Sequence, residues 1–243
     1  MLYPELQSLD DFEFIKNLGS GYTSNVDLYR HIQTDRIVAI KKLSIKNLTQ
    51  SECRKTYDTE ITILTKLQGC SNVVQLIGHG FYTTIDNNNR RTRTINNYFL
   101  ILEYIDVQPL DKNSERITKQ FYYKLLQTLQ KIHELGIVHR DLNLNNVLVQ
   151  NNEPILIDFA FGLVTNGKQK VAEFYGTKPY VAPEIIDGQS YLPYPTEVYS
   201  LGVILLELIN NNESKEIALQ MMQQNPYKRP NLEDVIAHPW FQL

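Results

Sequence analysis

The sequence of 243 residues predicts an α+β fold, built as one large domain or as two lobes, in which a small β-rich part precedes a larger, mostly helical part. Three observations carry this prediction. Residues 12–42 alternate apolar and polar side chains between turn signals, as antiparallel strands do. Glu52–Leu67 has the apolar spacing of one main helix. Ile117–Leu135 repeats that spacing later, and Thr196–Asn210 is apolar enough to form the core of the larger part.

Composition and charge exclude several classes of function. With 24 Lys and Arg against 27 Asp and Glu, the formal net charge of −3 gives no electrostatic reason to expect nucleic acid or an anionic membrane as partner. The longest apolar run, Leu201–Leu206, is too short to span a bilayer, and the polar N-terminus predicts no signal peptide. Cys53 and Cys70 lack metal-like spacing and indicate reduced thiols of an intracellular protein, cytoplasmic or nuclear. The sequence does not specify an oligomeric state.

Two further strands are predicted at Val73–Gly78 and Tyr98–Tyr104. The polar segment Thr83–Asn97 is predicted to be the loop that joins them. Its basic tip favours a solvated hairpin end over a docking site for an acidic partner, and contains Arg90, Arg91 and Arg93.

A lone lysine in an apolar strand is the first candidate functional residue. Lys41 ends the apolar run Val38–Lys41, and a buried ammonium group needs an anionic partner. Glu60 lies nineteen residues later, on the predicted helix. An ion pair between the two is favoured over a solvated glutamate. Earlier in residues 12–42, Gly19 and Gly21 would let backbone N–H groups approach a phosphate, although a tight hairpin explains the same glycines equally well.

Polar side chains also gather around a second predicted hairpin. The apolar runs Val147–Val149 and Ile155–Ile157 predict its two buried strands. Three polar side chains are expected at its open end or on the loop before it: Asp141, Asn146 and Asp158. Two carboxylates and an amide oxygen suit a hard cation such as Mg²⁺, with one carboxylate left to act as a base.

These residues stand in motifs that resemble those of eukaryotic protein kinases. Ile137–Gly162 resembles the catalytic loop H-R-D-L-x-x-x-N followed by D-F-G, and G-T-K-P-Y-V-A-P-E, ending at Glu184, resembles the Ser/Thr-kinase form of the activation segment. The resemblance covers residues 12–241. It implies a single kinase domain with an N-lobe at about 12–102, a hinge at about 103–106 and a C-lobe at about 107–241.

The resemblance implies an enzyme that moves the γ-phosphate of ATP to Ser or Thr hydroxyls of a protein substrate, with Mg²⁺ as cofactor. The implied catalytic and metal-binding residues are Asp141 as proton acceptor, Lys41 on the phosphates, Thr177 on the catalytic loop, and Asn146 and Asp158 on the metal. The implied ATP-binding residues are Gly19, Gly21, Val26, Ala39, Lys41, Glu60, Leu102 as gatekeeper, the backbone of Glu103 and Ile105, and Leu148.

The chain departs from the family pattern at several positions. Asn143 and Asn145 stand where such kinases carry a lysine or arginine, so no cation there meets the transferred phosphoryl group. Losing one such donor typically costs ~10²–10³ in rate, of which a polar amide at Asn143 should recover part. Ala160 replaces the glycine of D-F-G, and Ser24 the third glycine of the phosphate loop.

Further departures lie in the C-lobe. Glu197 replaces an aspartate and is expected to accept backbone hydrogen bonds from the catalytic loop, while Arg229 is expected to pair with Glu184. The eighteen residues between Glu207 and Pro226 leave out a helix that the family uses for docking. Three interpretations remain open: an active kinase is favoured, a nucleotide-binding pseudokinase acting as scaffold or allosteric partner comes second, and a small-molecule kinase third.

Overall fold

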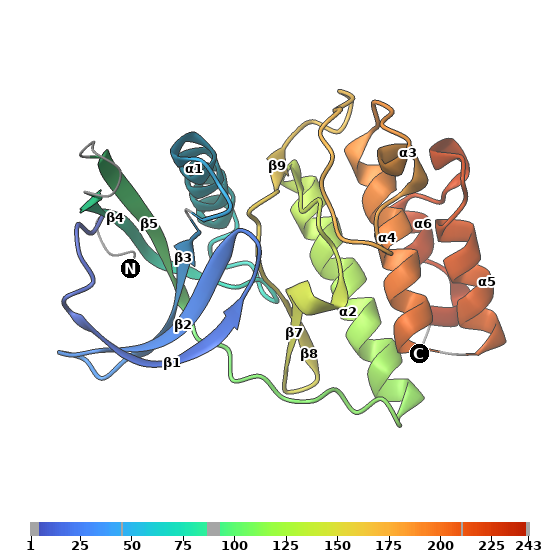
Figure 1. Ribbon diagram of the computed structural model, residues 1–243. Coiled ribbons are helices and arrows are strands. Elements are labelled where there is room, and N and C mark those ends of the chain that lie inside the picture. The colour runs from blue at the N-terminus through green and yellow to red at the C-terminus, as the bar shows by residue number, and fades with distance from the viewer. Residues whose placement is uncertain (1–4, 45, 87–92, 210, 242–243) are drawn as a thin grey trace. The chain divides into compact units, whose positions relative to one another are not determined.

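The computed structural model describes residues 5–44, 46–86, 93–209 and 211–241 (Figure 1). The chain forms two compact units. The first unit is Met1–Gly69 with Val74–Ile105, and the second is Cys70–Val73 with Asp106–Leu243. No helix in the described part of the chain is both long and apolar enough to cross a lipid bilayer.

The first unit is an antiparallel five-stranded sheet with one helix. The strand order is β1-β2-β3-β5-β4, with bounds β1 Phe12–Ser20, β2 Ser24–His31, β3 Ile37–Leu43, β4 Leu76–Asp86 and β5 Arg93–Glu103. Helix α1, Gln50–Lys66, packs against β4 and β5 (Figure 1). Thr49 and Glu52 form a capping box that starts this helix two residues before its predicted start. The predicted strands and main helix of this part are therefore present.

The predicted loop Thr83–Asn97 is wrong over most of its length. Strand β4 continues to Asp86 and β5 begins at Arg93, so the two strands extend the sheet as a paired ribbon. Thr83, Thr84 and Ile85 are exposed, so backbone hydrogen bonds rather than burial stabilise the outer end of the β4–β5 ribbon. Because this end is polar in sequence, its strands could not be predicted from an apolar pattern. Of the predicted basic tip, Arg90 and Arg91 lie outside the described residues.

The second unit is mostly helical. Its helices are α2 Glu115–Glu134, α3 Pro183–Ile186, α4 Pro193–Leu208, α5 Asn212–Met221 and α6 Leu232–Ile236, with short 3₁₀ turns η1 Leu144–Asn146, η2 Pro226–Lys228 and η3 Pro239–Phe241. Helix α4 is buried along most of its length, and α2 and α5 pack against it (Figure 1). The buried Tyr122 hydroxyl donates to the Leu201 carbonyl across 2.9 Å and ties α2 to α4.

Two small ribbons carry the loops of the second unit. One pairs β7 Val147–Gln150 with β8 Glu153–Leu156, and the other pairs β6 Ile137–Val138 with β9 Leu163–Val164. The turn of the first ribbon is made by Asn151 and Asn152, both with positive φ, which asparagine tolerates better than most residues. The predicted hairpin is thus confirmed.

In the second unit, the bounds of α4 differ from prediction and α5 is a helix that was not predicted. Helix α4 begins at Pro193 rather than Thr196, because proline is compatible with the first helical turn. It ends at Leu208, and the predicted end, Asn210, lies outside the described residues. The short interval after Glu207 holds one described helix, α5, which leads directly into η2 and leaves no length for an additional docking helix.

Candidate active site

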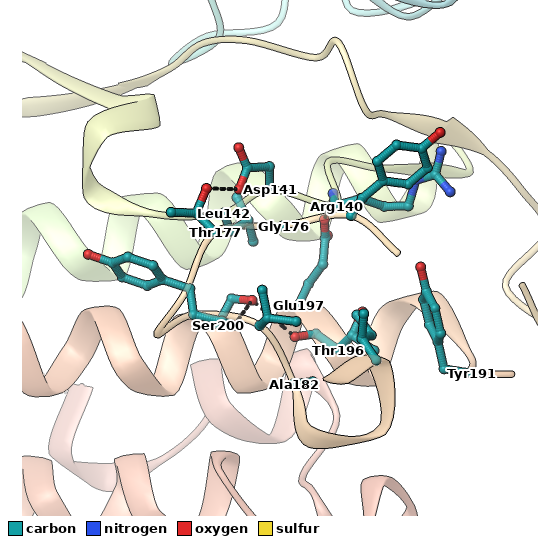
Figure 2. Close-up of a pocket in the computed structure, with 14 residues that line it drawn as sticks. Arg140, Asp141, Leu142, Gly176, Thr177, Ala182, Tyr191, Thr196, Glu197 and Ser200 are labelled. Carbon is teal, nitrogen blue, oxygen red and sulfur yellow. Dashed lines mark hydrogen bonds between the residues drawn. The ribbon is translucent and has the colours of Figure 1, made fainter. Parts of the chain in front are cut away.

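The carboxylate of Asp141 is the centre of the candidate site in the second unit. Its Oδ1 accepts hydrogen bonds from Thr177 Oγ1 at 2.8 Å and from Asn143 Nδ2 at 3.1 Å. Its Oδ2 accepts one from Asn146 Nδ2 at 3.1 Å. Figure 2 shows Thr177 and Asp141 joined by their hydrogen bond in the lining of a small pocket, which Ser200 and Glu197 also line. Three donors from the catalytic loop and the activation segment therefore fix the orientation of one carboxylate.

Asn143 is held entirely within the catalytic loop. Its side chain is only 2% exposed. Besides Asp141 Oδ1, its Nδ2 donates to the Asp141 carbonyl at 3.0 Å, and its Oδ1 accepts from Asn145 N at 3.0 Å as the cap of η1. An amide that makes these three bonds is already satisfied. The expectation that Asn143 recovers part of a lost lysine's charge stabilisation gains no support, because its donor group already points at Asp141.

The ribbon β7–β8 brings the candidate metal ligands to one end, as predicted. Ile157 N donates to the Asn146 carbonyl at 3.0 Å. Asp158 is the next residue after Ile157, so this hydrogen bond keeps Asn146 and Asp158 at the same end of the ribbon. Asn146 Nδ2 is bound to Asp141, which turns its amide oxygen away from that residue. Asp158 adopts φ 64°, a strained conformation that recurs at functional sites. Amide and carboxylate oxygens are the donors that Mg²⁺ prefers, so these residues fit that ion.

Ala160 fits its position without strain. Its N–H donates to Asp158 Oδ1 at 3.2 Å, and the left-handed backbone angle of this motif falls on Asp158 instead. A methyl group at residue 160 is therefore compatible with the conformation that the structure shows.

Glu197 supports the backbone of the catalytic loop from α4. Its Oε1 accepts from His139 N at 2.5 Å and Arg140 N at 2.8 Å, which confirms the prediction for this residue. Figure 2 shows Glu197 pointing toward Arg140. Its Oε2 lies 2.6 Å from His133 Nε2 of α2, a partner that sequence reasoning missed. His139 donates through Nε2 to the Ile157 carbonyl at 2.8 Å and accepts the Asp141 N–H at Nδ1, so one tautomer serves both bonds. These bonds fix the backbone on which Asp141 stands.

Arg140 holds the activation segment with its side chain. Its Nη1 lies 3.7 Å from Glu173 Oε2, although Nη1 has no hydrogen-bond acceptor among the described residues. The guanidinium lies 4.5 Å from the ring centroid of Tyr175, which stacks on Phe161. The Tyr191 hydroxyl donates to the Glu173 carbonyl at 2.8 Å, and burial raises the pKa of Tyr191, which keeps this donor protonated at neutral pH.

A turn after Thr177 is anchored at both ends. Tyr180 N donates to the Thr177 carbonyl at 2.9 Å and closes the turn Thr177–Tyr180. The Tyr180 hydroxyl donates to Glu207 Oε2 at 2.8 Å, and its carbonyl accepts from Ser200 Oγ at 2.8 Å. Burial first, and then the bond to Glu207, raise the pKa of Tyr180 to about 12, so it stays a hydrogen-bond donor.

The segment ends in a buried ion pair. Arg229 donates from Nη1 and Nη2 to the two oxygens of Glu184, each at 2.7 Å, so the predicted pair is confirmed and is bidentate. The same arginine donates to the Gln223 and Pro195 carbonyls, which leaves little of its donor capacity unused. A charge pair satisfied in this way fixes the end of the activation segment on the helices.

Another buried ion pair, between Lys41 and Glu60, lies in the first unit. Lys41 Nζ lies 2.7 and 2.8 Å from the two oxygens of Glu60, and the residues are 2% and 1% exposed. The predicted ion pair is confirmed. Gly21 N donates to the Ser24 carbonyl at 2.8 Å, so the glycines occupy a tight hairpin, and nothing lies within 4 Å of a side chain built on Gly19. That openness leaves room for a ligand beside the backbone.

The residues predicted to contact adenine divide between the units. Val26, Ala39, Leu102, Glu103 and Ile105 belong to the first unit, where Ala39 is the register partner of Leu102, and Leu148 belongs to the second. Glu103 N donates to the Gln75 carbonyl at 3.0 Å, so any adenine contact of Glu103 must use its carbonyl. The adenine-binding roles remain predictions.

Comparisons with known proteins identify the family of this chain. The family described as the protein kinase domain matches residues 12–214. An Aurora kinase of Yarrowia lipolytica is 26% identical over 96% of this chain and 69% of its own length. A probable serine/threonine-protein kinase PLK of Dictyostelium discoideum is 28% identical over 91% of this chain and 22% of its own length. An SNF-related serine/threonine-protein kinase of Rattus norvegicus is 26% identical over 95% of this chain and 34% of its own length.

Proposed function

The chain belongs to the protein kinase domain family, and from that premise we propose that it transfers the γ-phosphate of ATP to Ser or Thr hydroxyls of a protein substrate. One observation carries the proposal. Asp141 Oδ2 accepts a single hydrogen bond within the described structure, from Asn146, while three donors orient the carboxylate as a whole. A carboxylate oxygen has two lone pairs, so this one can still accept the proton of a substrate hydroxyl.

In the proposed reaction the substrate oxygen attacks the γ-phosphorus of ATP. Its proton passes to Asp141 Oδ2, the new P–O bond forms, and the bond to the β-phosphate oxygen breaks with release of ADP. The chain's contribution is positioning, since Thr177, Asn143 and Asn146 hold the base in one orientation before substrate arrives. Proton acceptance by an oriented base typically contributes ~10²–10⁴ in rate.

The remaining roles follow from the donor chemistry of each unit. Lys41, held by both carboxylate oxygens of Glu60, would bind the α- and β-phosphates of ATP. Asn146 and Asp158 would hold Mg²⁺, which when bound neutralises phosphate charge. A chain that binds no nucleotide has no need of a buried lysine paired with a buried glutamate, because such pairs give little net stability.

A second candidate function rests on Asn143. Its amide is bound to Asp141 and Asn145, and therefore supplies no positive charge to a phosphoryl group. A pseudokinase that binds nucleotide and acts as a scaffold would tolerate this loss. Of the two candidates, the active enzyme accounts for the oriented Asp141 and the scaffold does not.

Phosphotransfer from labelled ATP to a panel of Ser- and Thr-containing peptides tests the proposal. We expect slow but measurable transfer by the wild type, which falls ~10²–10⁴-fold in Asp141→Asn. Asn keeps the size of the side chain, and unchanged ATP binding in a thermal-shift assay would show that the variant is folded. Transfer at equal rates in both proteins would contradict the proposal, and its absence in both would favour the scaffold.

A further inference from the structure

The turn Thr177–Tyr180 presents one charged side chain beside the candidate base. The turn is anchored to Asp141 through Thr177, to Glu207 through the Tyr180 hydroxyl, and to Ser200 through the Tyr180 carbonyl. Lys178 stands at its exposed corner. Its backbone is therefore fixed relative to Asp141, while its side chain reaches solvent.

No acidic group of the described structure forms an ion pair with Lys178. The neighbouring acids of the activation segment are engaged elsewhere, since Glu173 faces Arg140 and Glu184 is bound to Arg229. Two other exposed lysines of the segment, Lys168 and Lys170, have the same sign as Lys178, and the exposed acid of the segment, Glu173, lies beside Arg140. The segment thus places positive charge next to the site in a chain whose net charge is −3.

Building on the proposed function, we propose that Lys178 makes the enzyme select protein substrates that carry a carboxylate within two residues of the acceptor hydroxyl. The hydroxyl must come within ~2.6–3.2 Å of Asp141 to lose its proton. Thr177 Oγ1 lies 2.8 Å from the same carboxylate, so a bound substrate passes the turn that carries Lys178. Residues one or two positions from the acceptor lie within about 7 Å of it along an extended peptide.

The exposed setting limits the size of the effect. An ion pair in solvent contributes ~0.2–1 kcal/mol, which corresponds to a preference of roughly 1.5- to 5-fold for a carboxylate over its amide. Charge repulsion of similar size should act against a lysine at the same substrate position. Because the pair is exposed, the preference should shrink as ionic strength rises.

Matched peptides test the inference. Each has one Ser acceptor and differs at a single position, from two residues before the acceptor to two after it, in carrying Asp, Asn or Lys. The ratio of kcat/KM for the Asp peptide to that for the Asn peptide is measured for the wild type, Lys178→Gln and Lys178→Glu. Lys168→Gln, which removes a lysine outside the anchored turn, is the matched control.

We expect a ratio of about 2 to 5 at one or more positions in the wild type and in Lys168→Gln, about 1 in Lys178→Gln, and below 1 in Lys178→Glu. A wild-type ratio that Lys178→Gln leaves unchanged would overturn the inference. So would an equal loss of turnover on all peptides in Lys178→Gln, because that result assigns the lysine to the transferred phosphoryl group instead.

A binding assay separates failure of this inference from failure of the proposed function. The same peptides, with Ala in place of the acceptor Ser, are titrated into the wild type and Lys178→Gln and followed by fluorescence anisotropy. Tighter binding of the Asp peptide by the wild type alone would support the selectivity even in a protein that transfers no phosphate. Equal affinity for Asp and Asn peptides in the wild type, with no preference in turnover, would overturn the inference.

Discussion

The small β-rich unit has a lysine at its family position, whereas the catalytic loop has an asparagine where related kinases have a lysine or arginine. In the first unit Lys41 is buried, with both oxygens of Glu60 within 2.8 Å of its ammonium group. In the catalytic loop the corresponding cationic position is Asn143, equally buried, whose amide is satisfied by Asp141 and Asn145. One site therefore holds a charge pair and the other a neutral hydrogen-bond network.

The difference separates two contributions to catalysis. Both arrangements orient a functional group, since Glu60 fixes an ammonium and Asn143 fixes a carboxylate. Only the first supplies positive charge to a phosphate. We therefore expect this chain to retain positioning and proton acceptance while it lacks part of the charge stabilisation, which alone typically accounts for ~10²–10³ in rate.

The largest expected effect is on the charged pair. Lys41→Met leaves the carboxylate of Glu60 buried without its ammonium partner, and should lower the free energy of unfolding by ~3–5 kcal/mol. The double variant Lys41→Met, Glu60→Leu removes both charges and should regain most of that stability without regaining ATP binding. Urea unfolding measures both proteins, with the half-exposed Lys42→Met as control. A loss no larger than that of the control would contradict the account.

Nucleotide binding should require both the lysine and a metal. ATP at about 100 times its Kd should stabilise the wild type by ~2.7 kcal/mol in the presence of Mg²⁺. Chelation of the metal with EDTA should remove most of that shift, because Asn146 and Asp158 would then hold no ion to neutralise the phosphate charge. Thermal-shift measurements with and without Mg²⁺ check this, and Lys41→Met should show no shift. Equal shifts under all three conditions would rule out the assigned roles.

Removing one hydrogen bond that orients Asp141 should have a smaller effect, and on kcat rather than on stability. Thr177→Val removes the hydroxyl that donates to Asp141 and keeps the shape of the side chain, so kcat should fall about tenfold, the value of a hydrogen bond to a charged group of ~1.5 kcal/mol. Thr177→Ser keeps the donor and should recover most of the rate. Steady-state kinetics on one peptide distinguish the two variants. Equal rates in Val and Ser would show that this hydrogen bond does not orient the base.

The smallest effect is expected at the activation segment. Glu173→Gln removes the carboxylate 3.7 Å from Arg140 and should lower kcat by a factor of about 2 to 5, as expected for a half-exposed charge pair. Protein treated with phosphatase should behave identically, because the segment is held by Tyr175, Tyr191 and Thr177 without a phosphate. An unchanged rate in Glu173→Gln would mean that Glu173 is only a solvated charge.

Sequence reasoning found the charged residues of the site and missed much of what holds them. The partner of Lys41 could be predicted because a buried charge requires a counter-charge. The partners of Glu184 and the backbone partners of Glu197 could be expected only from the resemblance to protein kinases, and that resemblance did not indicate His133. The hydrogen bonds of Tyr180 to Glu207 and Ser200 had no such signal, since tyrosine and serine occur equally in loops without partners. A hydrogen bond from an uncharged hydroxyl cannot be predicted from the sequence until the backbone that joins its partners is known.

Two fold predictions failed or fell short for similar reasons. Strands β4 and β5 extend past the predicted boundaries because their outer ends are solvated, so no apolar alternation marks them. Helix α5 was not predicted, although Asn211 and Ser214 form a capping box that could have indicated its start. The role of Asn143 needed the structure, because composition does not show whether an amide points at a phosphate or back into its own loop.

The central claim is that Asp141 is a working base in a loop that lacks its cation. Introducing Asn143→Lys into the wild type and into Asp141→Asn, and measuring kcat for phosphotransfer in all four proteins, tests it most directly. We predict a rise of about tenfold in kcat, larger than any fall in KM for ATP, when Asp141 is present, and no rise in the Asp141→Asn background. Folded, ATP-binding protein that shows no transfer in either Asp141 form, or an equal gain in both backgrounds, would contradict the claim.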